Sequence, residues 1–141
     1  MIGKIVTGKS FGGAVEYVLR KEKVRLLDSD GVDTESIRSI IDDFYFQRKA
    51  RREIAKVVGH ISLSFHRDDA PTLTDDRMRE LAAAYMECMG IADTQYIVAR
   101  HNDTEHPHLH IIYNRVKYDR TLVADKNERR RNVKVCKQLK R

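Results

Sequence analysis

Four of the six histidines in this chain lie within residues 101–110, which read HNDTEHPHLH. His108 and His110 are two residues apart in an apolar stretch, and alternate residues of a β-strand point to the same face. We therefore expect both imidazoles on one face of a strand, with Leu109 and Ile111 buried on the other. His101 ends the preceding apolar stretch, and antiparallel pairing across the loop would bring its ring alongside them.

Three converging imidazoles form a site for a divalent cation with open coordination positions, which suits catalysis. The predicted ligands are His101, His108 and His110. Asp103 and Glu105 lie in the same loop and are expected to orient a ring through its second nitrogen or to act as a base. His106 is a further ligand, a phosphate contact or a loop residue. Asn114 shares the histidine face by alternation, and it either contacts substrate or caps the end of the strand.

The elements that would position these side chains follow from hydrophobic periodicity and capping residues. In chain order we expect a strand at 2–7, a helix at 13–21 capped by Ser10, a polar loop at 28–33, a helix capped by Thr34, a strand at 60–66, a helix between Thr74 and Gly90, strands at 95–101 and 108–116, and a basic helix at 126–141. The loop between the last two strands is too short for a helical crossover, so they should pair antiparallel. The predicted fold is α+β, with a central antiparallel sheet and helices packed mainly on one face.

Composition and charge narrow the class of partner. The chain has 141 residues, of which 41% are hydrophobic, enough for one folded domain. The formal net charge is +6, and eight basic residues but one acidic residue lie at 126–141. A polyanionic partner, nucleic acid first, is therefore expected. Two unpatterned cysteines and the lack of a long apolar run argue against a disulfide framework and a membrane segment, and favour the cytoplasm.

Two families share motifs with the chain. HPHLHII, at residues 106–112, resembles the motif of histidine-triad nucleotide hydrolases, which need no metal. RHNDTEHPHLHIIYNRV, at residues 100–116, resembles the third motif of relaxases of the HUH endonuclease superfamily. GKSFGGAVEYVLRKEK, at 8–23, resembles the first motif of the MobA/VirD2-type (MOBP-like) relaxases, and the segment at 59–91 is similar to their linking region. The relaxase resemblance spans almost the whole chain in the right order.

This resemblance implies nicking and rejoining of one DNA strand at the transfer origin of a plasmid or mobile element. Tyr17 occupies the position of the nucleophile, which would form a 5′-phosphotyrosyl link. The implied cofactor is a divalent metal ion, Mn²⁺ or Mg²⁺, with Zn²⁺ or Ni²⁺ as alternatives. Tyr45, flanked by basic residues, is the competing nucleophile. Rolling-circle initiators and HUH transposases are related alternatives, but they commonly place the tyrosine after the histidines.

The implied partners are single-stranded DNA, accessory relaxosome proteins and a type IV coupling protein. The basic residues expected to contact DNA are Arg20, Lys21, Lys23, Arg25, Arg129, Arg130, Arg131 and Lys134. Members of the family are usually longer, so we expect residues 1–141 to be one catalytic domain, either the N-terminal fragment of a longer protein or a naturally short chain. A non-catalytic nucleic-acid-binding module with a structural metal is the remaining hypothesis.

Overall fold

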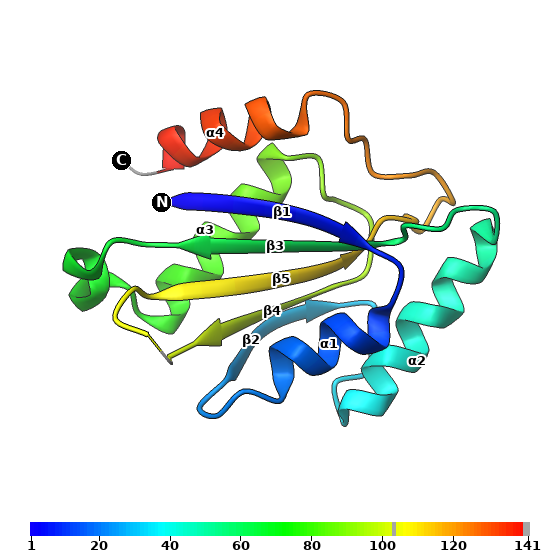
Figure 1. The fold of residues 1–141 in the computed structure, drawn as a ribbon, viewed down its shortest axis with the longest axis horizontal. Coiled ribbons are helices and arrows are strands. Elements are labelled where there is room, and N and C mark those ends of the chain that lie inside the picture. Colours follow the sequence, from blue (N-terminus) through cyan, green and yellow to red (C-terminus); the bar gives the residue numbers. More distant parts are fainter. Residues whose placement is uncertain (103, 140–141) are drawn as a thin grey trace.

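The computed structural model describes residues 1–102 and 104–139. Its centre is a five-stranded sheet in the order β1-β3-β5-β4-β2, and every neighbouring pair is antiparallel (Figure 1). The strands are β1 (Ile2–Gly8), β2 (Arg25–Asp30), β3 (Val58–Ser64), β4 (Tyr96–His101) and β5 (His108–Asn114). The predicted α+β fold with an antiparallel sheet is confirmed, including the direct pairing of β4 with β5.

The α-helices are α1 (Phe11–Leu19), α2 (Ile37–Arg48), α3 (Asp75–Cys88) and α4 (Glu128–Leu139), and the short 3₁₀ turns are η1 (Lys49–Arg51) and η2 (Arg67–Thr72). The sequence predicted two of the residues that cap the first three helices. Ser10 and Thr74 cap α1 and α3 as expected. The cap of α2 is Ser36 rather than Thr34, because Ser36 and Ser39 satisfy each other's backbone N–H groups in a capping box. Among the described residues, no helix has the length and apolar character needed to cross a membrane.

Helices cover both faces of the sheet, contrary to the expectation that they lie mainly on one. Strand β5 explains this, because Leu109 and Ile111 pack in the core that includes α3 and α4, whereas Ile112 packs with α1 and α2 on the opposite face. Helices α1 and α2 cover only part of that second face. On the rest of it the first residues of β5, together with β1 and β3, present polar side chains and the exposed Ile2 and Val6.

The strand β2 was not expected, because residues 28–33 read as a polar loop. It is an edge strand that pairs with β4, and its register shifts between Leu26 and Asp28. Of its residues only Leu27 is buried. A polar edge strand lacks the regular alternation by which a half-buried strand is recognised, so its sequence resembles a loop.

Helix α4 closes the opposite edge of the sheet beside β1. The side-chain amide of Asn132 donates a hydrogen bond of 2.7 Å to the Gly3 carbonyl, and its oxygen accepts one of 2.6 Å from the Tyr85 hydroxyl. One buried amide therefore ties α4 to both β1 and α3. This contact also occupies a backbone group on the exposed edge of β1, which would otherwise be available to pair with another strand.

Substitution of Gly59 by alanine is expected to destabilise the fold. Gly59 lies directly across from Tyr113 in the pairing of β3 with β5, and a Cβ at Gly59 would overlap the buried Tyr113 ring. Overpacking of this kind costs about 1–3 kcal/mol, measurable as a lower urea midpoint. Gly8→Ala is the control, because its added methyl group meets no atom within 4 Å. Equal midpoints for the two variants would contradict this packing.

Candidate metal centre and nucleophile

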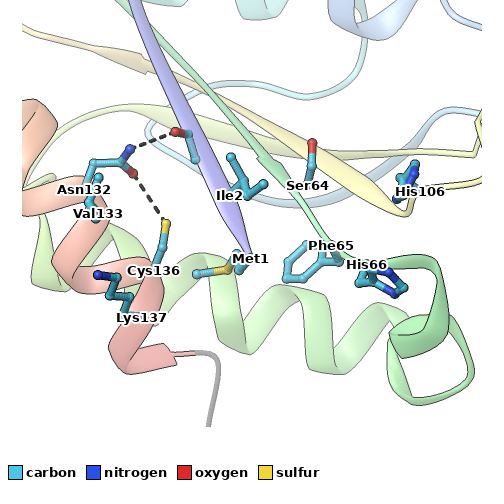
Figure 2. A pocket seen from close by; sticks show the side chains of 11 residues that line it. Met1, Ile2, Ser64, Phe65, His66, His106, Asn132, Val133, Cys136 and Lys137 are labelled. Carbon is cyan, nitrogen blue, oxygen red and sulfur yellow. Dashed lines mark hydrogen bonds between the residues drawn. The ribbon is translucent and has the colours of Figure 1, made fainter.

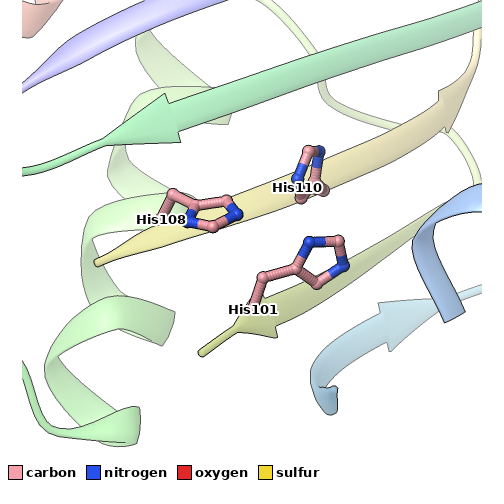
Figure 3. A group of neighbouring side chains, drawn as sticks. All are labelled: His101, His108 and His110. Carbon is pink, nitrogen blue, oxygen red and sulfur yellow. The ribbon is translucent and has the colours of Figure 1, made fainter. Parts of the chain in front are cut away.

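The pairing of β4 with β5 brings the three predicted ligands together. His101 lies directly opposite His108, and His110 is two residues farther along the same face of β5. Their ring centroids are 4.2–5.4 Å apart, and each offers a nitrogen within 4.8 Å of the others (Figure 3). His101 and His110 are buried, with 2% and 8% of their surfaces exposed, and His108 is half-buried. The three histidines could therefore hold one metal ion on the partly uncovered face of the sheet.

The second nitrogen of each ring has a hydrogen-bond partner that fixes the direction of the ring. His101 Nε2 donates to the Val18 carbonyl at 2.8 Å, and His108 Nδ1 donates to the His106 carbonyl at 3.1 Å. His110 Nδ1 lies 2.8 Å from Nε2 of His60. With protons on these nitrogens, the opposite nitrogen of each ring is the one that can coordinate a metal.

His60 is the residue at this site that the sequence did not indicate. The alternation of β3 placed it on the face opposite Ile61, but only the pairing of β3 with β5 brings it to His110. Burial lowers the pKa of His60, and the charges of His101 and Lys4 lower it further. In its neutral Nδ1–H tautomer, His60 has a lone pair on Nε2 that can accept the proton of His110 Nδ1.

The donor set fits a catalytic divalent ion. Three neutral imidazoles leave coordination positions open, and the three partners described above supply the outer hydrogen bonds that such ligands usually have. Metal–nitrogen bonds are about 2.1 Å long, so two ligand atoms of one ion lie at most about 4.2 Å apart. The candidate ligand atoms lie within 4.8 Å of one another, so the rings would have to draw closer together to bind one ion.

Tyr17 lies close to this histidine cluster, on the same face of the sheet. Helix α1 is anchored by the buried Val15 and Val18, while the Tyr17 side chain is 56% exposed. The Tyr17 ring centroid is 6.3 Å from that of His110 and 6.1 Å from that of His60. The Lys21 ammonium lies 4.9 Å from the centroid of the Tyr17 ring. The exposed phenol of Tyr17 and the Lys21 ammonium thus lie beside the His110 ring of the largely buried histidine cluster.

Comparison with known proteins agrees with this arrangement. The family model described as relaxase, MobA/VirD2-like, nuclease domain, matches residues 17–141, nearly the whole chain, and begins at Tyr17 itself. The chain belongs to the MobA/VirD2-like relaxase family. No curated protein gives a significant match. The relaxase resemblance expected from the histidine motif and the first helix is therefore confirmed, and this family is a nuclease domain family.

The remaining loop residues of the relaxase occupy different environments. Asp103 lies outside the described residues. Glu105 is exposed, and its carboxylate lies 3.7 Å from the Arg67 guanidinium, so it pairs there. The His106 carbonyl accepts a hydrogen bond from the His108 ring. The ring of His106 instead faces that of His66, at a centroid distance of 6.1 Å. In this arrangement the His106 backbone orients a predicted ligand, and its ring points to a neighbouring surface.

Asn114 was expected either to contact substrate or to cap the end of its strand, and its surroundings in the structure fit the second role. It is completely buried, which favours the role at the strand end over a substrate contact. Its amide donates to the Phe44 carbonyl and to the Gln95 side chain, and its oxygen accepts from the Val116 backbone. Although Asn114 shares the histidine face by alternation, α2 covers that end of the strand and converts the position into a buried cap.

Two of the basic residues expected to contact DNA form hydrogen bonds or ion pairs with other parts of the protein. The Arg131 guanidinium donates to three backbone carbonyls, those of Met89, Ala124 and Lys126. Arg25 pairs with Asp75 at the start of α3, 3.0 Å away. The Arg25 pair joins β2 to α3, and the Arg131 contacts join α4 to Met89 and to the segment that precedes α4. The contacts with Asp75 and Met89 could not be read from the sequence, because these partners lie far along the chain.

The other basic residues remain on the surface of the relaxase. Lys21 contacts Tyr17 as described, and Arg20 forms an exposed ion pair with Glu16 within α1. Lys23 has a positive φ of 60° in the turn after α1. The exposed cations of α4 include Arg129, Arg130 and Lys134. Their contact with DNA stays a prediction.

Proposed function

We propose that this relaxase domain nicks and rejoins one DNA strand at a transfer origin, with Tyr17 as the nucleophile. One observation carries the proposal. Tyr17 comes from α1 and the three histidines come from β4 and β5, yet the Tyr17 ring lies 6.3 Å from that of His110. In this role the domain would act in the cytoplasm with accessory relaxosome proteins and a type IV coupling protein.

The proposed step conserves the energy of the phosphodiester. Tyr17 Oη loses its proton and bonds to phosphorus as the bond from phosphorus to the 3′ oxygen breaks, and that oxygen gains a proton. The products are a 5′-phosphotyrosyl link and a 3′-hydroxyl, and the reverse reaction rejoins the strand. When bound at the three histidines, a divalent ion supplies Lewis-acid polarisation of the phosphate.

Lys21 is the first-motif cation best placed to assist Tyr17. A tyrosine has a reference pKa of about 10, so attack near pH 7 requires stabilisation of the developing phenolate. The Lys21 ammonium, 4.9 Å from the ring centroid, supplies a nearby positive charge. Glu105, paired with Arg67, is less well placed to accept the phenol proton.

The position of His106 argues against the nucleotide hydrolase alternative. That reading needs His106, His108 and His110 to act as one motif, and His106 would begin it. The His106 ring is exposed and faces His66, whereas His108 and His110 face His101. The spatial grouping of the rings therefore supports His101, and not His106, as the third proposed ligand.

We expect His60→Ala to weaken metal binding although His60 is not a proposed ligand. The variant removes the acceptor that orients His110, and loss of such an outer partner typically costs about 10–100-fold in metal affinity. Titration calorimetry with Mn²⁺ measures the change. His60→Gln can still accept the hydrogen bond through its amide oxygen and should recover part of the affinity. Ser62→Ala, on the same face of β3, is the control. Unchanged affinity in His60→Ala would remove His60 from the site.

Formation of a covalent adduct tests the proposed function. The protein is incubated with labelled single-stranded DNA carrying the transfer origin, with Mn²⁺ or with EDTA, and resolved on a denaturing gel. We expect a protein–DNA adduct and a free 3′ fragment with Mn²⁺ and neither with EDTA. Nucleotide hydrolysis in EDTA without an adduct would instead indicate a histidine-triad hydrolase, and metal-dependent DNA binding without cleavage would indicate a non-catalytic module.

A further inference from the structure

A cavity of about 650 Å³ lies at the edge of the sheet, between the start of β1, the end of β3 and α4 (Figure 2). Its lining is mostly apolar, and Met1, Ile2 and Phe65 contribute to it. Ile2 is 74% exposed, an unusual position for a large aliphatic side chain on a strand. The rings of His66 and His106 also line this cavity.

The cavity is connected to the histidine cluster by a row of paired residues across the sheet. Ile2 pairs with Ser64, Ser64 pairs with His108, and His108 pairs with His101. These residues share one face, and both Ile2 and Ser64 line the cavity. Neighbouring strands are about 4.8 Å apart, so Ile2 lies about 10 Å from His108. A stacked DNA strand advances about 3.4 Å per nucleotide, so this separation corresponds to roughly three nucleotides.

One exposed stripe of α4 adds positive charge beside the cavity. Arg130, Lys134 and Lys137 recur at helical spacing, and Val133, which is 53% exposed, lies among them. Val133 and Lys137 both line the cavity. Cations around an apolar hollow match the chemistry of a single-stranded nucleic acid, in which phosphates alternate with flat apolar bases. An apolar peptide would fill the hollow equally well but would make no use of this stripe.

We propose that this cavity is a subsite for an unpaired base of the single-stranded DNA substrate, and that the α4 stripe of Arg130, Lys134 and Lys137 holds adjacent phosphates. The inference rests on the proposed function, because it places the subsite a few nucleotides from the phosphate that reacts. The base lies against Ile2 and Phe65, and the imidazoles of His66 and His106 border it. Base contacts here position the strand before any chemistry occurs.

Photocrosslinking of the full chain in EDTA tests this subsite without requiring cleavage. The probe is an oligothymidylate in which thymines are replaced by 5-iodouracil, and the crosslinked peptides are identified by mass spectrometry. We expect crosslinks at Phe65, His66 or His106. Crosslinks found solely outside the cavity would overturn the proposal, as would an equally tight complex with an oligomer of abasic deoxyribose phosphates.

A pair of charge variants on α4 separates the cavity from general electrostatics. Val133→Glu places a carboxylate in the cavity wall, whereas Gln138→Glu adds the same charge at an exposed position that does not line it. We expect Val133→Glu to weaken oligothymidylate binding roughly tenfold, as loss of a stacked base does, and Gln138→Glu to weaken it much less. Equal weakening would contradict a base subsite. Cavity crosslinks in a protein that never cleaves origin DNA would leave the subsite standing and reject the proposed function.

Discussion

Tyr17→Phe is expected to abolish the covalent adduct with origin DNA and to lower strand cleavage by on the order of 10³-fold or more. The variant removes only the phenol oxygen, which is the atom proposed to bond to phosphorus. Because the Tyr17 side chain is 56% exposed, the loss of its hydroxyl group should change the free energy of unfolding little. Single-turnover cleavage with labelled origin DNA and Mn²⁺ measures the effect, alongside a thermal melt.

Tyr45→Phe is the matched control for this experiment. The sequence offered Tyr45 as the alternative candidate for the nucleophile. The Tyr45 ring packs edge-on against Phe11 at a centroid distance of 5.5 Å. Tyr17 instead has the rings of His60 and His110 as neighbours. We therefore expect Tyr45→Phe to keep both adduct and cleavage. The assignment is wrong if the adduct persists in Tyr17→Phe and disappears in Tyr45→Phe.

His108→Ala is expected to have the second large effect, a loss of Mn²⁺ binding and with it of cleavage. His108 is one of three proposed ligands, so its removal should exceed the roughly 10–100-fold penalty of losing an outer partner. Of the three, His108 is the least buried, so truncation disturbs the core least. An ion at 100 times its dissociation constant stabilises the folded protein by about 2.7 kcal/mol, so the variant should also lose the metal-induced rise in Tm.

The control for the metal experiment is His66→Ala. The His66 ring lies near that of His106, whereas the group that could hold an ion, among the residues that the structure describes, is His101, His108 and His110. Calorimetry should therefore give the wild-type Mn²⁺ affinity for His66→Ala, and Mn²⁺ should raise the Tm of this variant by as much as it raises that of the wild type. If His108→Ala binds Mn²⁺ as tightly as the wild type, the three histidines are not the metal site.

The histidine cluster was predictable because its geometry depends on local rules. Alternation placed His108 and His110 on one face, and a short loop required β4 and β5 to pair antiparallel, which brought His101 opposite His108. His60 escaped prediction because its contact with His110 depends on which strands are neighbours. Apart from β4 and β5, strands that follow one another in the chain are not neighbours in the sheet, so the pairing of β3 with β5 does not follow from the chain order.

The same distinction explains the errors in the fold and in the surface residues. Alternation identifies a strand with one buried face, so the largely exposed edge strand β2 read as a loop. Leu109, Ile111 and Ile112 show that β5 is apolar on both faces, and this is why helices cover both. Arg131 and Asn114 are polar residues whose partners lie far along the chain, so their structural roles required the folded protein.

Identification of the residue that carries the DNA tests the central claim most directly. The wild-type protein is incubated with origin DNA and Mn²⁺, the adduct is digested with protease and nuclease, and the modified peptide is sequenced by mass spectrometry. We predict a phosphonucleotide on Tyr17, formed with Mn²⁺ and not with EDTA. A nucleotide on Tyr45 or on a histidine, or an adduct that forms equally well in EDTA, would contradict the account.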